Sequence, residues 1–125
     1  MSTVYLAGGF KSGWQRTVIT SHKIIDPSTK DETGWTMQEI GDWDKDAINK
    51  SDVIFAYMER TNLSGFGLSC EIGYAHALGK TVILVLEKNH KKHDDRSLEF
   101  LTCFADYVFD NFDAGLTCLN ELPEG

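Results

Sequence analysis

The sequence predicts an α/β fold in which five parallel strands form one sheet between two layers of helices. Short apolar runs alternate with helical segments along the whole chain, and this alternation is typical of parallel sheets. The runs at 52–57 and 81–86 are apolar on both faces, as strands buried between two helical layers are. We expect the strand order 2-1-3-4-5, in which a ligand binds at the carboxyl ends of the strands, at the switch point between strands 1 and 3.

Each expected strand is a short apolar run that ends near a residue which interrupts regular structure. Gly8 and Gly9 close the first run, and Pro27 stops the second. In chain order, the strands are expected at 4–7, 23–27, 52–57, 81–86 and 107–109. The chain of 125 residues is long enough for one domain of this kind and too short for two.

The segments between these runs carry apolar residues at helical spacing or are polar loops. Helices are expected at 14–19, 36–50, 69–78, 97–103 and 114–122. Gly79 directly follows the third helix and is a plausible C-terminal cap. Loops are expected at 28–35, 61–67 and 90–95. We interpret His90 and His93 in the last loop as exposed residues rather than metal ligands.

The charge and the cysteines limit the classes of partner and compartment. Twelve Lys and Arg against nineteen Asp and Glu give a net charge of −7, which disfavours duplex nucleic acid and anionic membranes as partners. No run of eighteen apolar residues predicts a membrane span, and no basic N-terminal region predicts a signal peptide. Cys70, Cys103 and Cys118 are odd in number and far apart, which indicates reduced thiols in a cytoplasmic protein.

The turn after the first strand is the first candidate ligand site. It contains Gly8, Gly9 and Gly13, and glycine lets the backbone approach a ligand closely. The spacing differs from a dinucleotide fingerprint, because no third glycine opens the next helix in the required register. Trp14 follows the turn and is the best placed of the three tryptophans to stack on a base. The alternative is a tight strand-to-helix turn without a ligand.

Asp44 lies among apolar residues on one face of the helix expected at 36–50. The apolar stripe on that face consists of Met37, Ile40, Trp43, Ala47 and Ile48. A carboxylate in such a place is costly unless it is paired or used. Asp42 and Asp46 point away from the stripe and are expected to be solvated. Asp44 is therefore a candidate functional residue, and the alternative is a boundary residue that snorkels or caps.

Glu71 is expected in the first turn of the helix at 69–78, after a loop rich in glycine and serine. A helix N-terminus favours an ionised carboxylate, so a purely structural role is the alternative. The helix is apolar nearly all round and is expected to be buried, with Cys70 as a small buried hydrophobe. At the carboxyl end of strand 3, Glu71 is a suitable nucleophile for an anomeric carbon, with Asp44 as the acid/base group.

Three segments together resemble the nucleoside 2-deoxyribosyltransferase family and its nucleotide N-glycosidase relatives. They are residues 5–10, 44–54 and 64–80, of which Glu71–Ala75 is the most specific part. The resemblance implies a flavodoxin-like (Rossmann-like) three-layer sandwich, formed by one domain over residues 1–125. It also implies dimers or larger oligomers in which a neighbouring copy helps close the site.

The resemblance also implies roles for three residues. Glu71 is the nucleophile that forms a covalent 2-deoxyribosyl intermediate, Asp44 protonates the leaving base, and the Tyr5 hydroxyl orients Glu71. The substrate is a small nucleoside or nucleotide, and no metal or cofactor is expected. Substrate-binding residues are expected in the turn after strand 1 and in the loop before the helix, namely Gly8, Gly9, Phe10, Lys11, Ser12, Asn62, Ser64, Gly65 and Gly67.

Departures from the family pattern leave the reaction open between transfer and hydrolysis, and the substrate open between nucleoside and 5′-monophosphate. Gly65 stands where the transferases often have aspartate and the hydrolases tend to have serine. Gly9 and Lys11 stand where the hydrolases have a serine and a basic residue for the 5′-phosphate. If a phosphate binds, we expect Lys11 to hold it with Ser12 and the amides of Gly9 and Gly13. The alternative function is a non-catalytic nucleotide-binding module or sensor.

Overall fold

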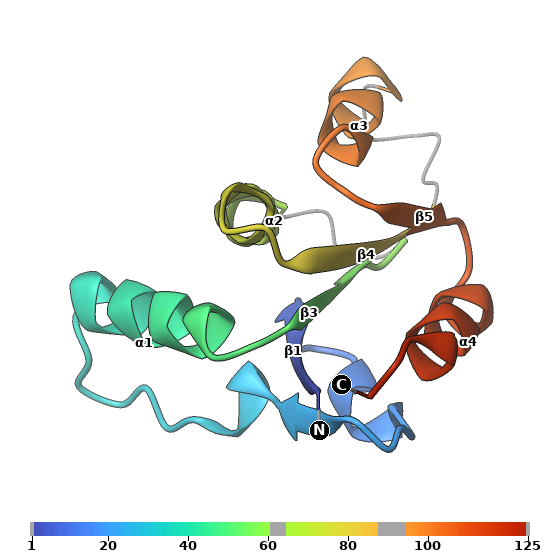
Figure 1. Cartoon of the computed structure of the whole chain (residues 1–125). Coiled ribbons are helices and arrows are strands. Elements are labelled where there is room, and N and C mark those ends of the chain that lie inside the picture. Colours follow the sequence, from blue (N-terminus) through green and yellow to red (C-terminus); the bar gives the residue numbers. More distant parts are fainter. Residues whose placement is uncertain (1, 61–64, 88–94, 125) are drawn as a thin grey trace.

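A parallel sheet runs through the centre of the molecule (Figure 1). The computed structural model describes residues 2–60, 65–87 and 95–124, and within them five strands pair in the order β2-β1-β3-β4-β5. The strands are β1 (Thr3–Gly8), β2 (Lys23–Ile25), β3 (Val53–Met58), β4 (Thr81–Leu86) and β5 (Tyr107–Phe109). All the pairings between neighbouring strands are parallel, which confirms the predicted fold class and strand order.

Helices cover both faces of this sheet (Figure 1). In the described residues they are α1 (Met37–Asn49), α2 (Phe66–Ala77), α3 (Asp95–Thr102) and α4 (Phe112–Glu121), with the short 3₁₀ turns η1 (Trp14–Thr17) and η2 (Pro27–Thr29). Helices α1, α2 and α3 pack on one face, while α4 and η1 pack on the other. None of these helices is long and apolar enough to cross a membrane.

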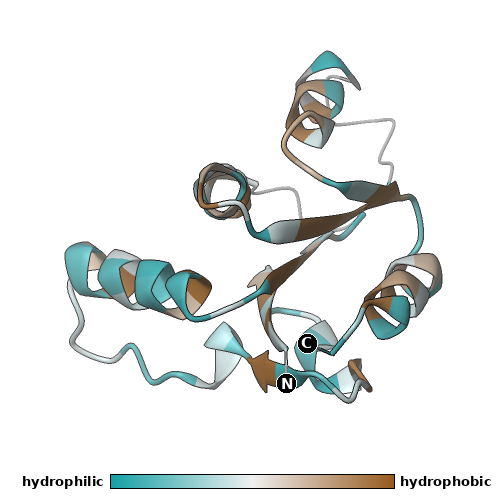
Figure 2. Cartoon of the chain, viewed as in Figure 1, coloured by the Kyte–Doolittle hydropathy of each residue, from teal (hydrophilic) through white to brown (hydrophobic). Residues whose placement is uncertain are grey.

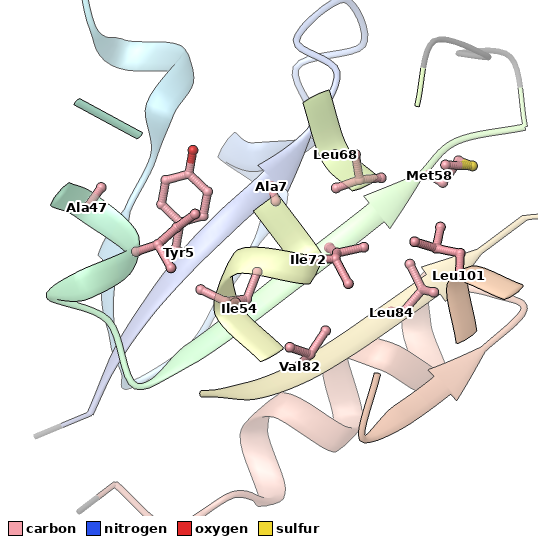
Figure 3. Close-up of a cluster of buried hydrophobic side chains, with 13 residues drawn as sticks. Tyr5, Ala7, Ala47, Ile54, Met58, Leu68, Ile72, Val82, Leu84 and Leu101 are labelled. Atoms are coloured by element: carbon pink, nitrogen blue, oxygen red, sulfur yellow. The ribbon is translucent and has the colours of Figure 1, made fainter. Parts of the chain in front are cut away.

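Each face of the sheet has its own apolar core. Side chains alternate along β1, so Tyr5 and Ala7 join the core under α1 and α2, while Val4 and Leu6 join the core under η1 and α4. Figure 3 shows the first of these cores, with Tyr5 beside Ala47 of α1. The strands are the most hydrophobic elements, and the helices carry hydrophilic residues between their apolar ones (Figure 2). The alternation along β1 therefore decides that Tyr5 faces α1 and α2.

The start of α1 agrees with the prediction, because Thr36 and Glu39 cap this helix. The Thr36 hydroxyl accepts a hydrogen bond from the Glu39 amide at 3.1 Å, and the Glu39 carboxylate accepts one from the Thr36 amide at 3.1 Å. This capping box fixes the rotation of the helix from its first turn. Ile48 is buried against the sheet, and Asp44, one turn earlier, lines the space between α1 and α2. Asp42 and Asp46 are exposed, as predicted.

The helix expected at 14–19 is a single 3₁₀ turn that ends at Thr17. Residues 17–19 are all β-branched, and such residues lose side-chain freedom in a helix. The Trp14 ring is 4% exposed and packs against Tyr57 with 5.2 Å between ring centroids, and its Nε1 donates to the Gly9 carbonyl at 2.9 Å. Of the two roles open to Trp14, stacking on a base or packing, the structure shows packing, because the core already covers its ring.

Helix α2 is buried on one side only, contrary to the prediction. It begins at Phe66 rather than Ser69, and the Ser69 hydroxyl donates to the Gly65 carbonyl at 2.6 Å. The side toward the sheet is formed by Leu68, Ile72 and Ala75. Phe66 is 88% exposed and Cys70 is also exposed, so Cys70 is not a buried hydrophobe. A helix in the outer layer of a three-layer fold packs only one face against the sheet. The opposite face of α2 is therefore exposed although its residues are largely apolar.

Candidate active site

The hydroxyl of Tyr5 and the carboxylate of Glu71 form the centre of the candidate site. Tyr5 lies on β1, and 1% of its surface is exposed. Its Oη donates a hydrogen bond of 2.5 Å to Glu71 Oε2 on α2. Glu71 itself is half-buried. The side-chain alternation of β1 and the packing of α2 on that face bring together two residues far apart in the sequence.

The surroundings of Glu71 raise the pKa of its carboxyl toward neutral pH. Burial raises the pKa of the Glu71 carboxyl to about 7, and the negative charge of Asp44 adds to the rise. The hydrogen bond from Tyr5 and the positive charge of Lys30 act in the opposite direction. Burial and the carboxylates of Glu71 and Asp44 raise the pKa of Tyr5 far above its usual range. Tyr5 therefore remains a hydrogen-bond donor while Glu71 titrates near pH 7.

A buried lysine holds the second carboxylate of the site. Lys30 follows η2, and 5% of its side chain is exposed. Its Nζ lies 2.6 Å from Asp44 Oδ1 and 3.0 Å from Glu32 Oε2, and it lies 4.6 Å from the centre of the Trp43 ring. Burial lowers the pKa of Lys30, but hydrogen bonds and charges from Asp44 and Glu32 outweigh burial, so the net shift is upward. A positive charge is thus fixed beside Asp44 at neutral pH.

Two pockets meet at Glu71. The first, here called the glycine pocket, has a volume of about 250 Å³ and lies at the carboxyl ends of β1 and β3. Its walls are formed by Gly8, Gly9, Phe10, Tyr57, Met58, Glu59, Gly67, Leu68 and Glu71. The position agrees with the rule for parallel sheets, in which ligands bind where the strand order reverses.

The second pocket, here called the α1–α2 pocket, lies between these two helices and has a volume of about 410 Å³. Its walls are formed by Met37, Ile40, Gly41, Asp44, Lys45, Ile48, Gly67, Cys70, Glu71 and Tyr74. Glu71 and Gly67 belong to both pockets, whereas Asp44 belongs to this one. One carboxylate therefore stands at the boundary between two spaces, and the other lines the larger space.

The glycine pocket depends on the absence of a side chain at Gly8. This residue has φ of +148°, a conformation that other residues rarely adopt. A Cβ there would lie 2.5 Å from the carbonyl oxygen of Tyr57 and 3.1 Å from the Trp14 ring. Glycine thus lets the end of β1 pass close to β3 and form part of the pocket wall.

Four of the predicted substrate-binding residues line the glycine pocket: Gly8, Gly9, Phe10 and Gly67. Gly65 directly precedes α2, and a Cβ there would lie 2.6 Å from the terminal carbon of Met58. Asn62 and Ser64 lie outside the described residues. The turn after β1 and the start of α2 therefore meet at one pocket.

Lys11 and Ser12 are exposed and are not among the described wall residues of the glycine pocket. The Ser12 hydroxyl donates to the Glu59 carboxylate and accepts from the Trp14 amide at 3.3 Å. The Gly13 amide donates to the Phe10 carbonyl at 3.2 Å. Two of the groups expected to hold a phosphate, those of Ser12 and Gly13, thus have partners within the protein.

Glu71 lies in the second turn of α2 rather than the first, because the helix begins at Phe66. Burial is the largest cause of its pKa shift, and it opposes the ionised form that a helix N-terminus would favour. Lys30 and Glu59 belong to the site although the sequence analysis does not single them out. Glu59 directly follows β3, so the rule for carboxyl ends of strands identifies it in retrospect. Lys30 lies in a polar loop without periodicity, and no sequence signal marks it.

The match to a family model extends over the segments that carry this site. The model, described as nucleoside 2-deoxyribosyltransferase like, matches residues 1–89 of this chain. That part contains Tyr5, Asp44 and Glu71, together with the described walls of both pockets. No curated protein matches the sequence.

Solved structures with the same fold share little sequence with this chain. A 2-deoxyribosyltransferase from Leishmania mexicana superposes with a TM-score of 0.67 and 21% identity, over 97% of this chain and 98% of that chain. A CMP N-glycosidase from Clostridium botulinum superposes with a TM-score of 0.58 and 21% identity, over 94% and 97%. A conserved protein from Enterococcus faecalis does so with a TM-score of 0.53 and 19% identity, over 96% and 88%. These structures show the fold, and the family model over residues 1–89 shows that the chain belongs to the nucleoside 2-deoxyribosyltransferase-like family.

Proposed function

We propose that the protein cleaves the N-glycosidic bond of a 2′-deoxynucleoside or nucleotide and passes the sugar to another base or to water. The observation that carries this proposal is the placement of Glu71. Its carboxylate is held by the Tyr5 hydroxyl at 2.5 Å and stands where two pockets meet, and Asp44 lines one of them. A nucleophile and an acid/base group around one substrate are what a two-step glycosyl transfer requires. The membership in an enzymatic family supports the same chemistry.

The pockets suggest how the substrate lies. Asp44, as the proton donor, has to reach the leaving base, and it lines the α1–α2 pocket. That pocket is lined largely by apolar side chains such as Met37, Ile40 and Ile48, which suit the faces of a planar base. The sugar then occupies the glycine pocket, and C1′ lies at the boundary beside Glu71.

The reaction proceeds in two balanced steps. In the first, the Glu71 carboxylate bonds to C1′, the bond from C1′ to the base breaks, and the base takes its electron pair together with a proton from Asp44. In the second, an incoming base or water bonds to C1′, the bond to Glu71 breaks, and Asp44 takes up the proton that the incoming group loses. Tyr5 orients Glu71 for attack through its hydrogen bond.

We infer that copies of the chain associate and that a neighbour helps close the site. Met37 is 78% exposed and lines the α1–α2 pocket, and Phe66 is 88% exposed and directly precedes Gly67, another residue of the pocket wall. Exposed large apolar side chains beside a pocket are typical of interfaces. Light scattering should give a dimer or larger species, and Phe66→Ser should shift it toward the monomer. A wild-type monomer at high concentration would contradict this inference.

The cysteines support a cytoplasmic setting for this activity. Cys70, Cys103 and Cys118 are all free thiols, and Cys70 lines the α1–α2 pocket. Exposed free thiols persist in reducing compartments. We therefore propose that the enzyme acts in the cytoplasm.

Incubation with a panel of 2′-deoxynucleosides and their 5′-monophosphates, with and without an acceptor base, tests the proposed function. Chromatography should show release of free base from at least one substrate, and Glu71→Gln protein should release none. A new nucleoside in the presence of the acceptor base would establish transfer, and free sugar without it would establish hydrolysis. Tight binding without release of base would instead support a nucleotide-binding module.

A further inference from the structure

Glu59 is a carboxylate in the wall of the glycine pocket, and the two-step chemistry does not use it. It directly follows β3, is half-buried, and shares the pocket wall with Glu71. In the substrate placement proposed above, this pocket receives the sugar. The charge and the acceptor oxygens of Glu59 therefore affect which sugars this pocket can bind.

A hydrogen bond within the protein orients the Glu59 carboxylate. The Ser12 hydroxyl donates its proton to Glu59 Oε1, while the Ser12 oxygen accepts from the Trp14 amide at 3.3 Å. Among the described residues, no group donates to the other carboxylate oxygen, Oε2. Oε1 of Glu59 is thus held by Ser12, and Oε2 can accept a hydrogen bond from a donor group of a ligand.

The charges around the glycine pocket are negative. Its described walls contain the carboxylates of Glu59 and Glu71 and no lysine, arginine or histidine. A third carboxylate lies behind the wall, because the Tyr57 hydroxyl donates to Glu87 Oε2 at 2.7 Å. Arg60 directly follows Glu59 and is exposed, and the sequence of residues 61–64 contains no charged side chain.

The basic residues nearest in sequence, Lys11, Arg16 and Arg60, are not among the described wall residues. Lys11 is exposed and lies outside the described wall residues. Arg16 is also exposed, and its guanidinium lies over Gly13, where a Cβ would be 2.6 Å from Nη2. The charged side chains in the described wall of the glycine pocket are therefore carboxylates, and the Lys30 ammonium lies outside this wall, 6.0 Å from the centre of the Phe10 ring.

We propose that Glu59 makes the glycine pocket selective for an unphosphorylated sugar, so that the substrates are nucleosides and not nucleoside monophosphates. A sugar hydroxyl donates a hydrogen bond to Glu59 Oε2, which is a charge-assisted bond. A phosphate group carries about −1.5 to −2 charges at pH 7 and offers acceptors in place of donors. Two carboxylates in a partly buried pocket repel it, and like charges brought together at a binding site suppress the wrong ligand. This inference rests on the proposed function, because it names the substrate class of that site.

The test compares kcat/KM for 2′-deoxynucleosides with the values for their 5′- and 3′-monophosphates. The wild-type protein should prefer the nucleoside by at least about 100-fold, which corresponds to about 2.7 kcal/mol. Glu59→Gln removes the charge and keeps the shape of the side chain, so it should reduce this preference at least about 10-fold. The value of kcat/KM should fall for the nucleoside and rise for the monophosphate. Glu99→Gln is the matched control, because Glu99 is exposed on α3 and its replacement changes the net charge equally. This control should leave the preference unchanged.

Calorimetric binding of the same ligands to Glu71→Gln protein separates selectivity from turnover. The nucleoside should bind more tightly than either monophosphate, and adding Glu59→Gln should reduce the difference. Ser12→Ala removes the hydrogen bond that orients the Glu59 carboxylate but keeps its charge. This variant should bind the nucleoside more weakly and should still not bind the monophosphates.

Cleavage of a monophosphate in preference to the nucleoside would overturn the role of Glu59 and leave the proposed function standing. Selective binding of the nucleoside without release of base would overturn the proposed function and support the selectivity. An unchanged preference in folded Glu59→Gln protein, or no binding of either ligand class, would overturn the inference.

Discussion

The Tyr5 hydroxyl donates a 2.5 Å hydrogen bond to the Glu71 carboxylate and thereby links strand β1 to helix α2. The bond lowers the pKa of Glu71, while burial and Asp44 raise it to about 7. Tyr5 keeps its proton because its own pKa lies far above neutral, as burial and both carboxylates require. The pair therefore holds an ionisable carboxylate in a fixed orientation, with a donor that does not titrate near neutral pH.

Removing the Tyr5 hydroxyl should slow catalysis and raise the pKa of Glu71. A hydrogen bond to a charged group contributes about 1.5–3 kcal/mol, so Tyr5→Phe should lower kcat/KM about 10- to 100-fold. The acid limb of the pH profile should also move to higher pH, because the bond that favours the ionised carboxylate is gone. Tyr107→Phe is the matched control, since Tyr107 is 42% exposed on β5. Tyr5→Phe with wild-type rates at every pH would show that the hydrogen bond has no catalytic role.

The wild-type pH profile should report the ionisation of Glu71. In the proposed reaction Glu71 attacks only as a carboxylate, so kcat/KM should fall about tenfold per pH unit below a midpoint near pH 7. The charge of Lys30 lowers the pKa of Glu71, so Lys30→Met should move that midpoint upward. Lys30→Arg keeps the charge and should restore the midpoint.

Lys50→Met provides the control for Lys30→Met, because Lys50 is 68% exposed and pairs with Asp46 at the end of α1. It should leave the midpoint in place. A midpoint at lower pH in folded Lys30→Met protein would show that Lys30 does not lower the pKa of Glu71.

Glu71→Gln should make the folded protein more stable at neutral and alkaline pH. The folded-state pKa of Glu71 is about 7 against an ordinary value of 4.5, so the folded state binds the proton more tightly than the unfolded chain does. Wild-type stability is therefore lost as pH rises from about 4.5 to about 7, by at most about 3 kcal/mol. The amide carries no such cost and can still accept the bond from Tyr5.

Thermal unfolding of wild-type and Glu71→Gln proteins across this window measures the effect. The advantage of the variant should be small near pH 4.5, grow up to about pH 7 and stay constant above it. An advantage that is the same at every pH would mean that the burial of Glu71 does not govern its ionisation.

Asp44→Asn should lower kcat/KM by about 10²–10⁴, the usual contribution of general acid/base catalysis. The loss should shrink for substrates whose base departs without protonation, because these do not need the acid. The exposed Asp46 on the same helix supplies the control Asp46→Asn. An equal loss for activated and ordinary substrates would assign Asp44 a structural role, as the partner of Lys30.

The sequence predicts those features that depend on local patterns. Strands β4 and β5 have the expected boundaries, because uninterrupted apolar runs between loops leave little choice of register. Asp44 was identifiable because a carboxylate interrupts an apolar helical stripe, and Tyr5 and Glu71 because they stand in segments that resemble a family. The signal at Asp44 lies within one helix, whereas the resemblance rests on three segments of the chain.

Features that depend on the path of loops or on tertiary packing were not predictable in this way. Lys30 reaches Asp44 from an irregular segment, and its contact exists only once η2 and α1 are in place. The start of α2 was misplaced because Gly65 and Gly67 suggest a loop, whereas the packing of Leu68 extends the helix. Local propensity gave way to burial in that case.

The proposed reaction requires that Glu71 forms a covalent bond to the sugar. Mass spectrometry of peptides from enzyme that is quenched during turnover of a 2′-deoxynucleoside tests it most directly. We expect a peptide containing Glu71 that is heavier by one deoxyribosyl group, that disappears when an acceptor base is added before quenching, and that is absent from Glu71→Gln protein. Release of base by the Glu71→Gln protein at a rate near that of wild type, with no modified peptide in either, would contradict it.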